Sequence, residues 1–146
     1  MGTIIIMIGI QGSGKSEFCR QFLQEYEHIS LDELHTRNKE QIEIDRCFTE
    51  GISFVIDNTN PTKSEREKYI SQGKENRYKI IGYFMESKLQ PCIKRNNMRE
   101  GKSKIPSKAI AATSNKLELP DYSEGFDELY FVHNDGEIMT IEEWKK

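Results

Sequence analysis

The sequence lacks a hydrophobic run long enough to cross a membrane. Only 36% of its 146 residues are hydrophobic, and the N-terminal run TIIIMI has six residues with no basic leader before it. A membrane-spanning helix needs about 20 apolar residues, and a signal peptide starts with a basic segment. These absences predict a protein without membrane contact, located in the cytosol or in the nucleus of a host that has one.

Residues that ligate transition metals are also scarce. The chain has three cysteines, an odd number at wide spacing, which predicts reduced buried thiols rather than disulfides. Its three histidines form no H-x-x-x-H pattern and no His/Cys cluster in the sequence, so we expect no structural metal. These residues are Cys19, Cys47, Cys92, His28, His35 and His133.

The length allows one domain, residues 1–146. Apolar β-branched runs alternate with segments of helical period, and no internal repeat interrupts them. This order predicts an α/β fold, a three-layer sandwich around a mainly parallel sheet. Strands are expected at 3–8, 28–31, 52–56, 78–84 and 129–132, and helices at 16–26, 34–50, 62–73, 87–99 and 106–117.

The apolar spacing also predicts which side chains face the core. Gly73 is the expected terminator of its helix. The inward-facing residues are expected to be Phe18, Phe22 and Leu23, then Leu34, Ile42 and Phe48, and then Leu89, Ile93 and Met98.

A glycine-rich loop follows the first strand. GIQGSGKS matches G-x-x-x-x-G-K-[ST] with a strand before it and a helix after it, which is the context that gives this pattern value. Such a loop turns its N–H groups toward phosphate oxygens at a helix N-terminus. The pattern therefore predicts ATP and Mg²⁺ as cofactors, with Ser16 as the Mg²⁺ ligand. The binding residues are Gly9, Gly12, Ser13, Gly14, Lys15 and Ser16. We call residues 9–16 the phosphate loop.

Two aspartates close the second and third strands, on the edge where the phosphate loop lies. Phosphoryl transfer to an alcohol needs a base for the hydroxyl proton, and we favour Asp32 for it over a role as helix N-cap. Asp57 would orient an arginine or hold water on Mg²⁺. Alternatively, it is a turn residue of DNTNP, where Asn58 and Asn60 satisfy backbone groups.

The segment KRNNMREGKSK is the candidate for a helical lid, over approximately residues 87–106. Arg95 and Arg99 are four residues apart, so one helical face would present both guanidinium groups to the phosphates. A solvated basic helix is the alternative.

Charge is unevenly distributed along the chain. Residues 62–116 carry 14 basic and 5 acidic side chains, whereas both flanking thirds are acidic and the whole chain has a net charge of -3. This +9 block is either a solvated surface or a surface for a polyanion.

These features together resemble the kinase half of the 5'-polynucleotide kinases, including the kinase domain of polynucleotide kinase/3'-phosphatase enzymes. The resemblance covers most of the chain. It rests on GIQGSGKSEF, the aspartate of ISLDEL, FVIDNTNPTKSEREKYI, IKRNNMREG, IPSKAI and EGFDEL, which occur in the family's order.

The resemblance implies roles for single residues. Lys15 and Ser16 would bind ATP and Mg²⁺, Asp32 would be the general base, and Arg99, with Arg95 behind it, would meet the donor phosphates. Asp57, Asn58 and Thr59 would shape the acceptor site. Family members often have an arginine after the catalytic aspartate that holds the acceptor phosphate. Here His35 and then Arg37 stand in that region, and both remain candidates.

We therefore expect an ATP-dependent kinase that acts on the 5'-hydroxyl ends of DNA or RNA. No D-x-D-x-[TV] phosphatase motif is present, so kinase activity alone is expected. A kinase for a nucleoside, sugar or other small alcohol is one alternative. A nucleotide-binding switch without a substrate is another. The sequence does not decide between DNA and RNA, nor does it set the oligomeric state.

Overall fold

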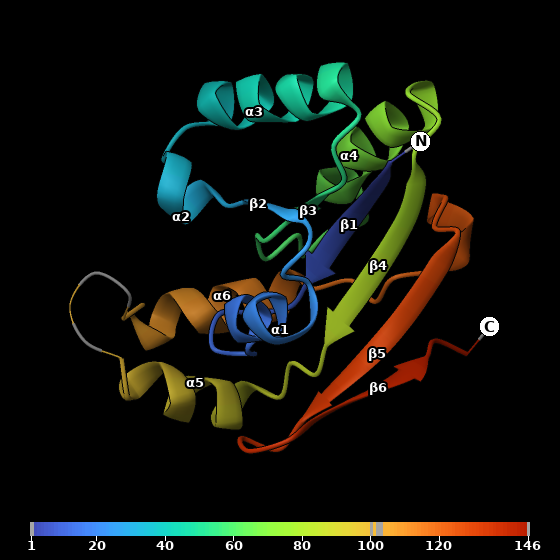
Figure 1. The fold of residues 1–146 in the computed structure, drawn as a ribbon. Coiled ribbons are helices and arrows are strands. Elements are labelled where there is room, and N and C mark those ends of the chain that lie inside the picture. The colour runs from blue at the N-terminus through green and yellow to red at the C-terminus, as the bar shows by residue number, and fades with distance from the viewer. Residues whose placement is uncertain (1, 100, 102–103, 146) are drawn as a thin grey trace.

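The computed structural model describes residues 2–99, 101 and 104–145. Its strands form one six-stranded sheet in the order β2-β3-β1-β4-β5-β6 (Figure 1). All neighbouring strands are parallel except β5 and β6, which are antiparallel. The strands are β1 (Thr3–Ile8), β2 (Glu27–Ile29), β3 (Phe54–Ile56), β4 (Lys79–Met85), β5 (Glu128–Asn134) and β6 (Met139–Glu143).

Helices cover both faces of the sheet, so the predicted three-layer α/β architecture is confirmed. The helix α1 packs on one face, and α3 and α4 pack on the other. The helices are α1 (Lys15–Phe22), α2 (Leu31–Leu34), α3 (Arg37–Glu50), α4 (Lys63–Glu75), α5 (Leu89–Asn97) and α6 (Ser107–Lys116), with a short 3₁₀ turn, η2 (Tyr122–Glu124).

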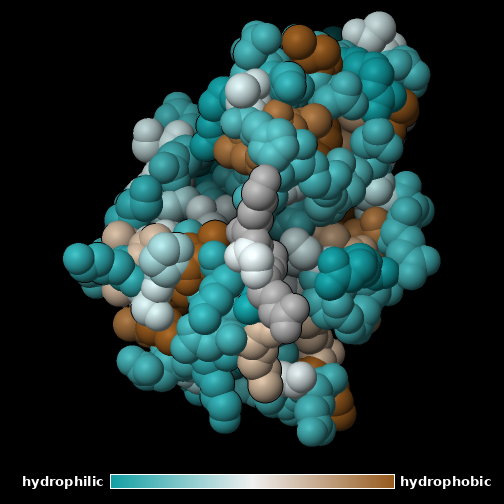
Figure 2. Space-filling view, turned by 90° about the vertical axis from the view of Figure 1, so that its left-hand side faces the viewer, coloured by the Kyte–Doolittle hydropathy of each residue, from teal (hydrophilic) through white to brown (hydrophobic). Residues whose placement is uncertain are grey.

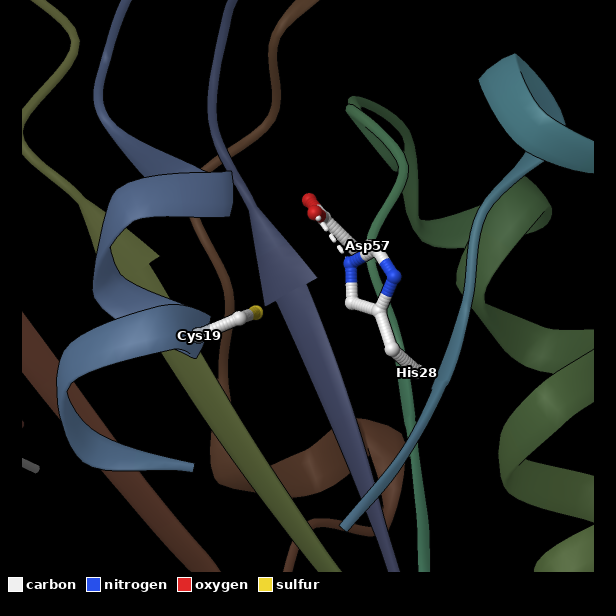
Figure 3. A group of neighbouring side chains, drawn as sticks. All are labelled: Cys19, His28 and Asp57. Carbon is white, nitrogen blue, oxygen red and sulfur yellow. Dashed lines mark hydrogen bonds and ion pairs between the residues drawn. The ribbon is translucent and has the colours of Figure 1, made fainter. Parts of the chain in front are cut away.

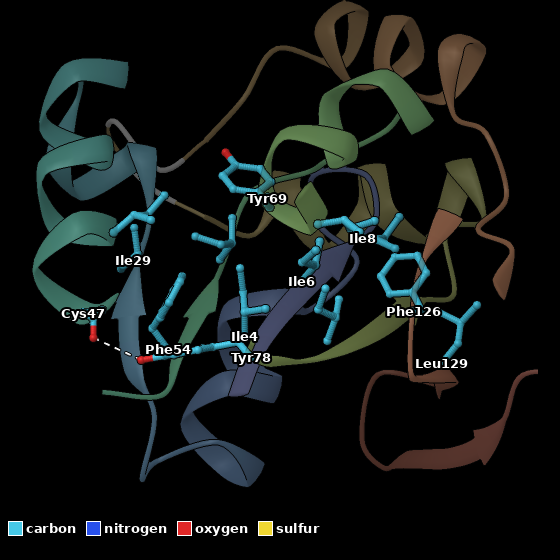
Figure 4. Close-up of a cluster of buried hydrophobic side chains, with 14 of the residues drawn as sticks. Ile4, Ile6, Ile8, Ile29, Cys47, Phe54, Tyr69, Tyr78, Phe126 and Leu129 are labelled. Carbon is cyan, nitrogen blue, oxygen red and sulfur yellow. Dashed lines mark hydrogen bonds between the residues drawn. The ribbon is translucent and has the colours of Figure 1, made fainter. Parts of the chain in front are cut away.

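The central position of β1 explains its unbroken apolar sequence. β1 pairs with β3 on one side and β4 on the other. Its even-numbered side chains, Ile4, Ile6 and Ile8, enter the core under α3 and α4 (Figure 4), and Ile5 and Met7 enter the core under α1. A strand that is buried on both faces is apolar along nearly its whole length.

The predicted helix over 34–50 is wrong at its start. Leu31–Leu34 form one helical turn, His35 follows with a left-handed backbone (φ 70°), and α3 begins only at Arg37. Thr36 caps α3 by accepting a hydrogen bond from the backbone N–H of Lys39. Local capping chemistry therefore divides a segment whose apolar period is weak.

Three residues expected in the core are exposed, namely Phe22 (42%), Ile42 (56%) and Met98 (79%). The core of α3 uses Ile44 and Cys47 instead. Gly73 does not terminate a helix, because α4 continues to Glu75. A Cβ atom on Gly73 would lie 3.1 Å from side-chain atoms of Ile4 and Ile80, so this glycine lets α4 approach the sheet closely.

The edge strand β6 was not predicted. Its sequence, MTIEE, lacks the apolar run of the inner strands because most of its side chains face solvent. Within the described ranges, no helix has the length and apolar character needed to cross a membrane.

Candidate functional site

A cleft of about 930 Å³ opens beyond the carboxyl ends of the parallel strands. Hydrophilic residues predominate on the side of the molecule that carries α2 and the chain between α5 and α6 (Figure 2). Several sequence segments far apart in the chain meet in the cleft wall. Its lining residues are Gln11, Gly12, Lys15, Ser16, Arg20, Leu31, Asp32, His35, Asp57, Asn58, Thr59, Arg99 and Ile105.

The phosphate loop has the form of an anion cradle. Gly12 and Gly14 have left-handed backbones with φ of 82° and 97°. A Cβ atom on Gly12 would lie 2.2 Å from the carbonyl oxygen of Cys92, which no side chain can tolerate. In the part of the chain that the structure describes, the amides of Gly12, Gly14, Lys15 and Ser16 have no hydrogen-bond partner. Unpaired N–H groups at a helix N-terminus fit a bound phosphate.

Lys15 is held in place beside this cradle. Its ammonium group donates a hydrogen bond to the carbonyl oxygen of Ile10 at 3.0 Å. Burial lowers the pKa of Lys15, although the nearby Asp57 carboxylate pulls it in the opposite direction. An ammonium group deprived of water gains by contact with an anion.

Ser16 and Asp57 form the pair suited to Mg²⁺. The Ser16 hydroxyl donates to Asp57 Oδ2 at 2.8 Å. His28 Nε2 also donates to that oxygen at 2.7 Å. Burial alone would raise the pKa of Asp57, but the His28 hydrogen bond and the Lys15 charge outweigh it and hold the pKa below its usual range. A hydroxyl beside an ionised carboxylate is the hard oxygen chemistry that Mg²⁺ prefers.

Asp32 is not the cap of its helix. The capping residue of α2 is Ser30, whose hydroxyl accepts from the backbone N–H of Asp32 at 3.2 Å. The Asp32 side chain is exposed and lines the cleft. The alternative interpretation as an N-cap is therefore wrong, and the carboxylate remains available to the cleft.

The stretch DNTNP connects the strand ends to one another. Asn58 Oδ1 accepts from the backbone N–H of Leu31 at 3.0 Å, which ties α2 and therefore Asp32 to the end of β3. The carbonyl oxygen of Thr59 accepts from Gly9 N in the phosphate loop, and Asn60 Nδ2 donates to the carbonyl oxygen of Met7 in β1.

The downstream arginine Arg66 secures this stretch from α4. Its guanidinium is fully buried, donates to the carbonyl oxygen of Asn60 and forms an ion pair with Glu124 at 2.9 Å. A buried charge without such partners would cost several kcal/mol. The first three residues of DNTNP line the cleft, whereas Asn60 and Arg66 lie behind it and hold this stretch in place.

The structure separates the two candidates for the acceptor phosphate. His35 lines the cleft, whereas Arg37 does not. Arg37 donates to Tyr69 OH at 2.8 Å and to the buried Glu40 at 3.2 Å. Glu40 also accepts from Asn58 and Tyr69, so Arg37 belongs to the polar network under α3.

Arg95 and Arg99 do not share a helical face as predicted, because α5 ends at Asn97. Arg95 Nε donates to the carbonyl oxygen of Gly12 at 2.7 Å, so this guanidinium binds the back of the phosphate loop. Arg99 lines the cleft, where its charge acts on the pKa of Lys15. Of the lid segment, Glu100, Lys102 and Ser103 lie outside the described residues.

Several residues of the site were missed in the sequence. Arg20 lies in the cleft wall one helical turn after Ser16, a spacing that could have revealed it. Asn134 donates to the carbonyl oxygen of Ser13, and Ser87 Oγ accepts from Ile10 N. No local signal marks these two residues, since their partners are 121 and 77 positions away.

A P-loop protein with a kinase-type fold is defined by these features together. They are the buried strand β1, the phosphate loop, Lys15 and the pair of Ser16 and Asp57. A model of the AAA domain family matches residues 4–120, and the chain belongs to this family.

Two curated relatives carry the likeness to polynucleotide kinases. The putative bifunctional polynucleotide phosphatase/kinase of Acanthamoeba polyphaga mimivirus is 33% identical over 98% of this chain. The bifunctional polynucleotide phosphatase/kinase of Schizosaccharomyces pombe is 27% identical over 84% of it. The match spans 36% and 31% of those two proteins, so the chain corresponds to about a third of their length.

Solved structures confirm the fold class. Kti12 of Chaetomium thermophilum, in complex with ADP-AlF3, superimposes with a TM-score of 0.66 at 15% identity, over 92% of this chain and 90% of that one. A gluconokinase from Sinorhizobium meliloti gives a TM-score of 0.60 at 20% identity, over 90% and 82% of the two chains.

Proposed function

We propose that this protein is an ATP-dependent kinase that transfers the γ-phosphoryl group to the 5'-hydroxyl end of DNA or RNA. The observation that carries the proposal is the cleft in which the phosphate loop, Asp32, Asp57 and Arg99 face one space. The two polynucleotide phosphatase/kinase relatives supply the acceptor class.

Each residue has a defined task in this reaction. The unpaired amides of the phosphate loop and the Lys15 ammonium group hold the donor phosphates. Ser16 and Asp57 hold Mg²⁺, which when bound neutralises charge on the phosphates. Asp32 accepts the proton of the attacking hydroxyl and aligns its oxygen with the γ-phosphorus. Arg99 stabilises the charge that develops on the transferring group.

His35 is assigned to the acceptor side of the cleft. It follows Asp32 by three residues and lines the same wall, and its left-handed backbone ends α2 there. We therefore propose His35 rather than Arg37 for contact with the acceptor phosphate.

A small alcohol is the second candidate acceptor, because the gluconokinase shares the fold. The test is transfer of labelled phosphate from ATP to 5'-hydroxyl DNA, 5'-hydroxyl RNA, nucleosides and gluconate, with Lys15→Ala as the inactive control. We expect label on oligonucleotides only. Label on nucleosides or gluconate but not on oligonucleotides would overturn the proposed acceptor. A substrate-free switch would label none of them.

A further inference from the structure

Three side chains with metal-binding groups meet beside the cleft, although the sequence separates them widely. Cys19 comes from α1, His28 from β2 and Asp57 from the end of β3. Their ligand atoms all lie within 4.8 Å of one another, and the Cys19 sulfur faces the other two groups (Figure 3). The spacing of cysteine and histidine in the sequence gave no sign of this cluster.

The distances suit a small cation after a modest adjustment. Zinc binds sulfur at about 2.3 Å and nitrogen at about 2.0 Å, so the ligand atoms of a tetrahedral site lie roughly 3.5 Å apart. His28 Nε2 and Asp57 Oδ2 are 2.7 Å apart and share a proton. A cation that takes the place of this proton would draw in the thiolate, since ligand atoms that now lie up to 4.8 Å apart would approach to roughly 3.5 Å.

The other nitrogen of His28 is already oriented for such a role. Nδ1 lies 2.8 Å from Glu33 Oε1. A carboxylate that accepts from one ring nitrogen fixes the tautomer and leaves the other nitrogen as ligand, the arrangement found around most metal-bound histidines.

An open fourth position adjoins the cluster. A pocket of about 480 Å³ is lined by Ser16, Cys19 and His28 among other residues, so water can reach the ion there. Three protein ligands with one exchangeable position is a common arrangement for zinc. The thiolate favours a zinc-type cation over Mg²⁺, which prefers oxygen ligands.

We propose that Cys19, His28 and Asp57 form a binding site for a zinc-type divalent cation, and that its occupancy suppresses phosphate transfer. Binding releases the thiol proton of Cys19 and the proton shared by His28 and Asp57. The ion then coordinates Asp57 Oδ2, which is the oxygen that accepts the hydrogen bond of the Ser16 hydroxyl. Only the suppression rests on the proposed kinase function.

The surroundings favour an exchangeable ion over a permanently bound one. Burial raises the pKa of the Cys19 thiol to about 12, so forming the thiolate is costly. Lys15 and Arg20 place positive charge near the same sulfur, which lowers that cost but repels the cation. Both effects weaken binding relative to a structural zinc site.

The test compares the wild type with Cys19→Ser and with Cys47→Ser, a matched control that changes another buried thiol in the opposite core. Co²⁺ should give thiolate-to-cobalt charge-transfer absorption in the wild type and in Cys47→Ser, but not in Cys19→Ser. Loss of a ligand should weaken Zn²⁺ binding by about tenfold or more in a chelator competition assay. Zn²⁺ should raise Tm in the wild type and in Cys47→Ser, but not in Cys19→Ser.

Equal Zn²⁺ affinity in wild type and Cys19→Ser, or a cobalt complex without the thiolate band, would overturn the site. Transfer assays then test suppression, since Zn²⁺ should inhibit the wild type and Cys47→Ser at concentrations that leave Cys19→Ser active. Inhibition of all three alike would overturn the suppression. A protein without any transfer activity would contradict the proposed function and leave the cobalt result to decide the site.

Discussion

Asp57, at the end of β3, links Ser16 of the phosphate loop to His28 of β2. Its buried carboxylate accepts from Ser16 and from His28 at once. The sequence predicted a functional aspartate here because Asp57 ends a buried strand, but it left open a simple turn. The two hydrogen bonds join the Asp57 carboxylate to side chains of the site, whereas Asn58 and Asn60 do bond to backbone groups, as the turn alternative expected.

Asp32→Asn should leave the fold intact and lose roughly 10² to 10⁴ in transfer rate, the usual range for a positioned general base. The side chain is exposed and Ser30 supplies the cap, so little stability depends on the carboxylate. Asp45→Asn on the exposed side of α3 is the control. We would measure kcat, nucleotide affinity and Tm for both. A normal kcat in Asp32→Asn would show that another group takes the proton.

The ion pair of His28 makes stability depend on pH. The hydrogen bond to Asp57 raises the pKa of His28 above its usual value near 6.5. A raised pKa adds stability that is fully present below the unfolded-state value and is lost as pH rises through the folded-state value. The wild type should thus exceed His28→Gln in stability most at about pH 5.5 and least at about pH 8.5. Urea unfolding at both pH values would check this, and a constant difference would contradict it.

At the scale of elements, the phosphate loop is held by its neighbours as much as by its own glycines. α5 contacts it through Cys92 and Arg95, and β5 through Asn134. The pattern of glycines predicted the loop because strand, loop and helix follow one another in the chain. It could not predict these contacts, which depend on how distant elements pack.

Gly12→Ala should therefore cost more than about 2 kcal/mol and abolish nucleotide binding, because a Cβ atom would collide with the Cys92 carbonyl and the backbone is left-handed. Gly51→Ala is the matched control. Gly51 is also left-handed (φ 69°), but among the described residues no atom beyond its chain neighbours lies within 4 Å of a Cβ there, so the substitution should cost only about 1 kcal/mol. Urea unfolding would compare them, and equal costs would show that the collision is relieved by movement of α5.

The C-terminal end of α5, at Asn97, separates Arg95 from Arg99. Arg99→Ala should depress kcat strongly with little change in nucleotide affinity, because Arg99 lines the cleft and is predicted to act in the transition state. Arg99→Lys should recover little, since an ammonium group lacks the two-pronged contact. Arg95→Ala should instead weaken nucleotide binding, because Arg95 holds the Gly12 carbonyl. Steady-state kinetics would give kcat and nucleotide titration would give the affinity of all three variants. A loss of affinity in Arg99→Ala with a normal kcat would contradict the prediction.

Over the whole molecule, the acidic C-terminal third neutralises part of the basic block. Lys74 pairs with Asp127 at 3.5 Å and Lys79 pairs with Glu128, both at the end of the sheet opposite the cleft. The number of these charges can be read from the sequence. Which of them lie at the cleft and which at the opposite end of the sheet depends on the fold. We predict that a polyanion would meet the basic residues between α5 and α6, because Arg95 of α5 holds the Gly12 carbonyl and Lys116 of α6 pairs with Glu65.

Neutralising Lys102 and Lys104 should weaken oligonucleotide binding and reduce its salt dependence, by a slope of about 0.7 per lost contact to a single strand. Lys102 lies outside the described residues, and Lys104 is exposed next to Ile105 of the cleft wall. The control neutralises Lys74 and Lys79, an equal change in charge. Binding measured over a range of salt should change its slope in the first variant only, and identical slopes would assign no contact to the segment.

The hydrogen bond from Asn134 to Ser13 spans 121 positions of the chain. A ribosome adds about 5 to 20 residues per second, so roughly 6 to 24 s separate the synthesis of these two partners. During the first part of that interval β1 also waits for β4, with which it forms its longest parallel pairing. Within this chain, the glycine-rich segment is thus synthesised many seconds before the strand that completes its hydrogen bonds.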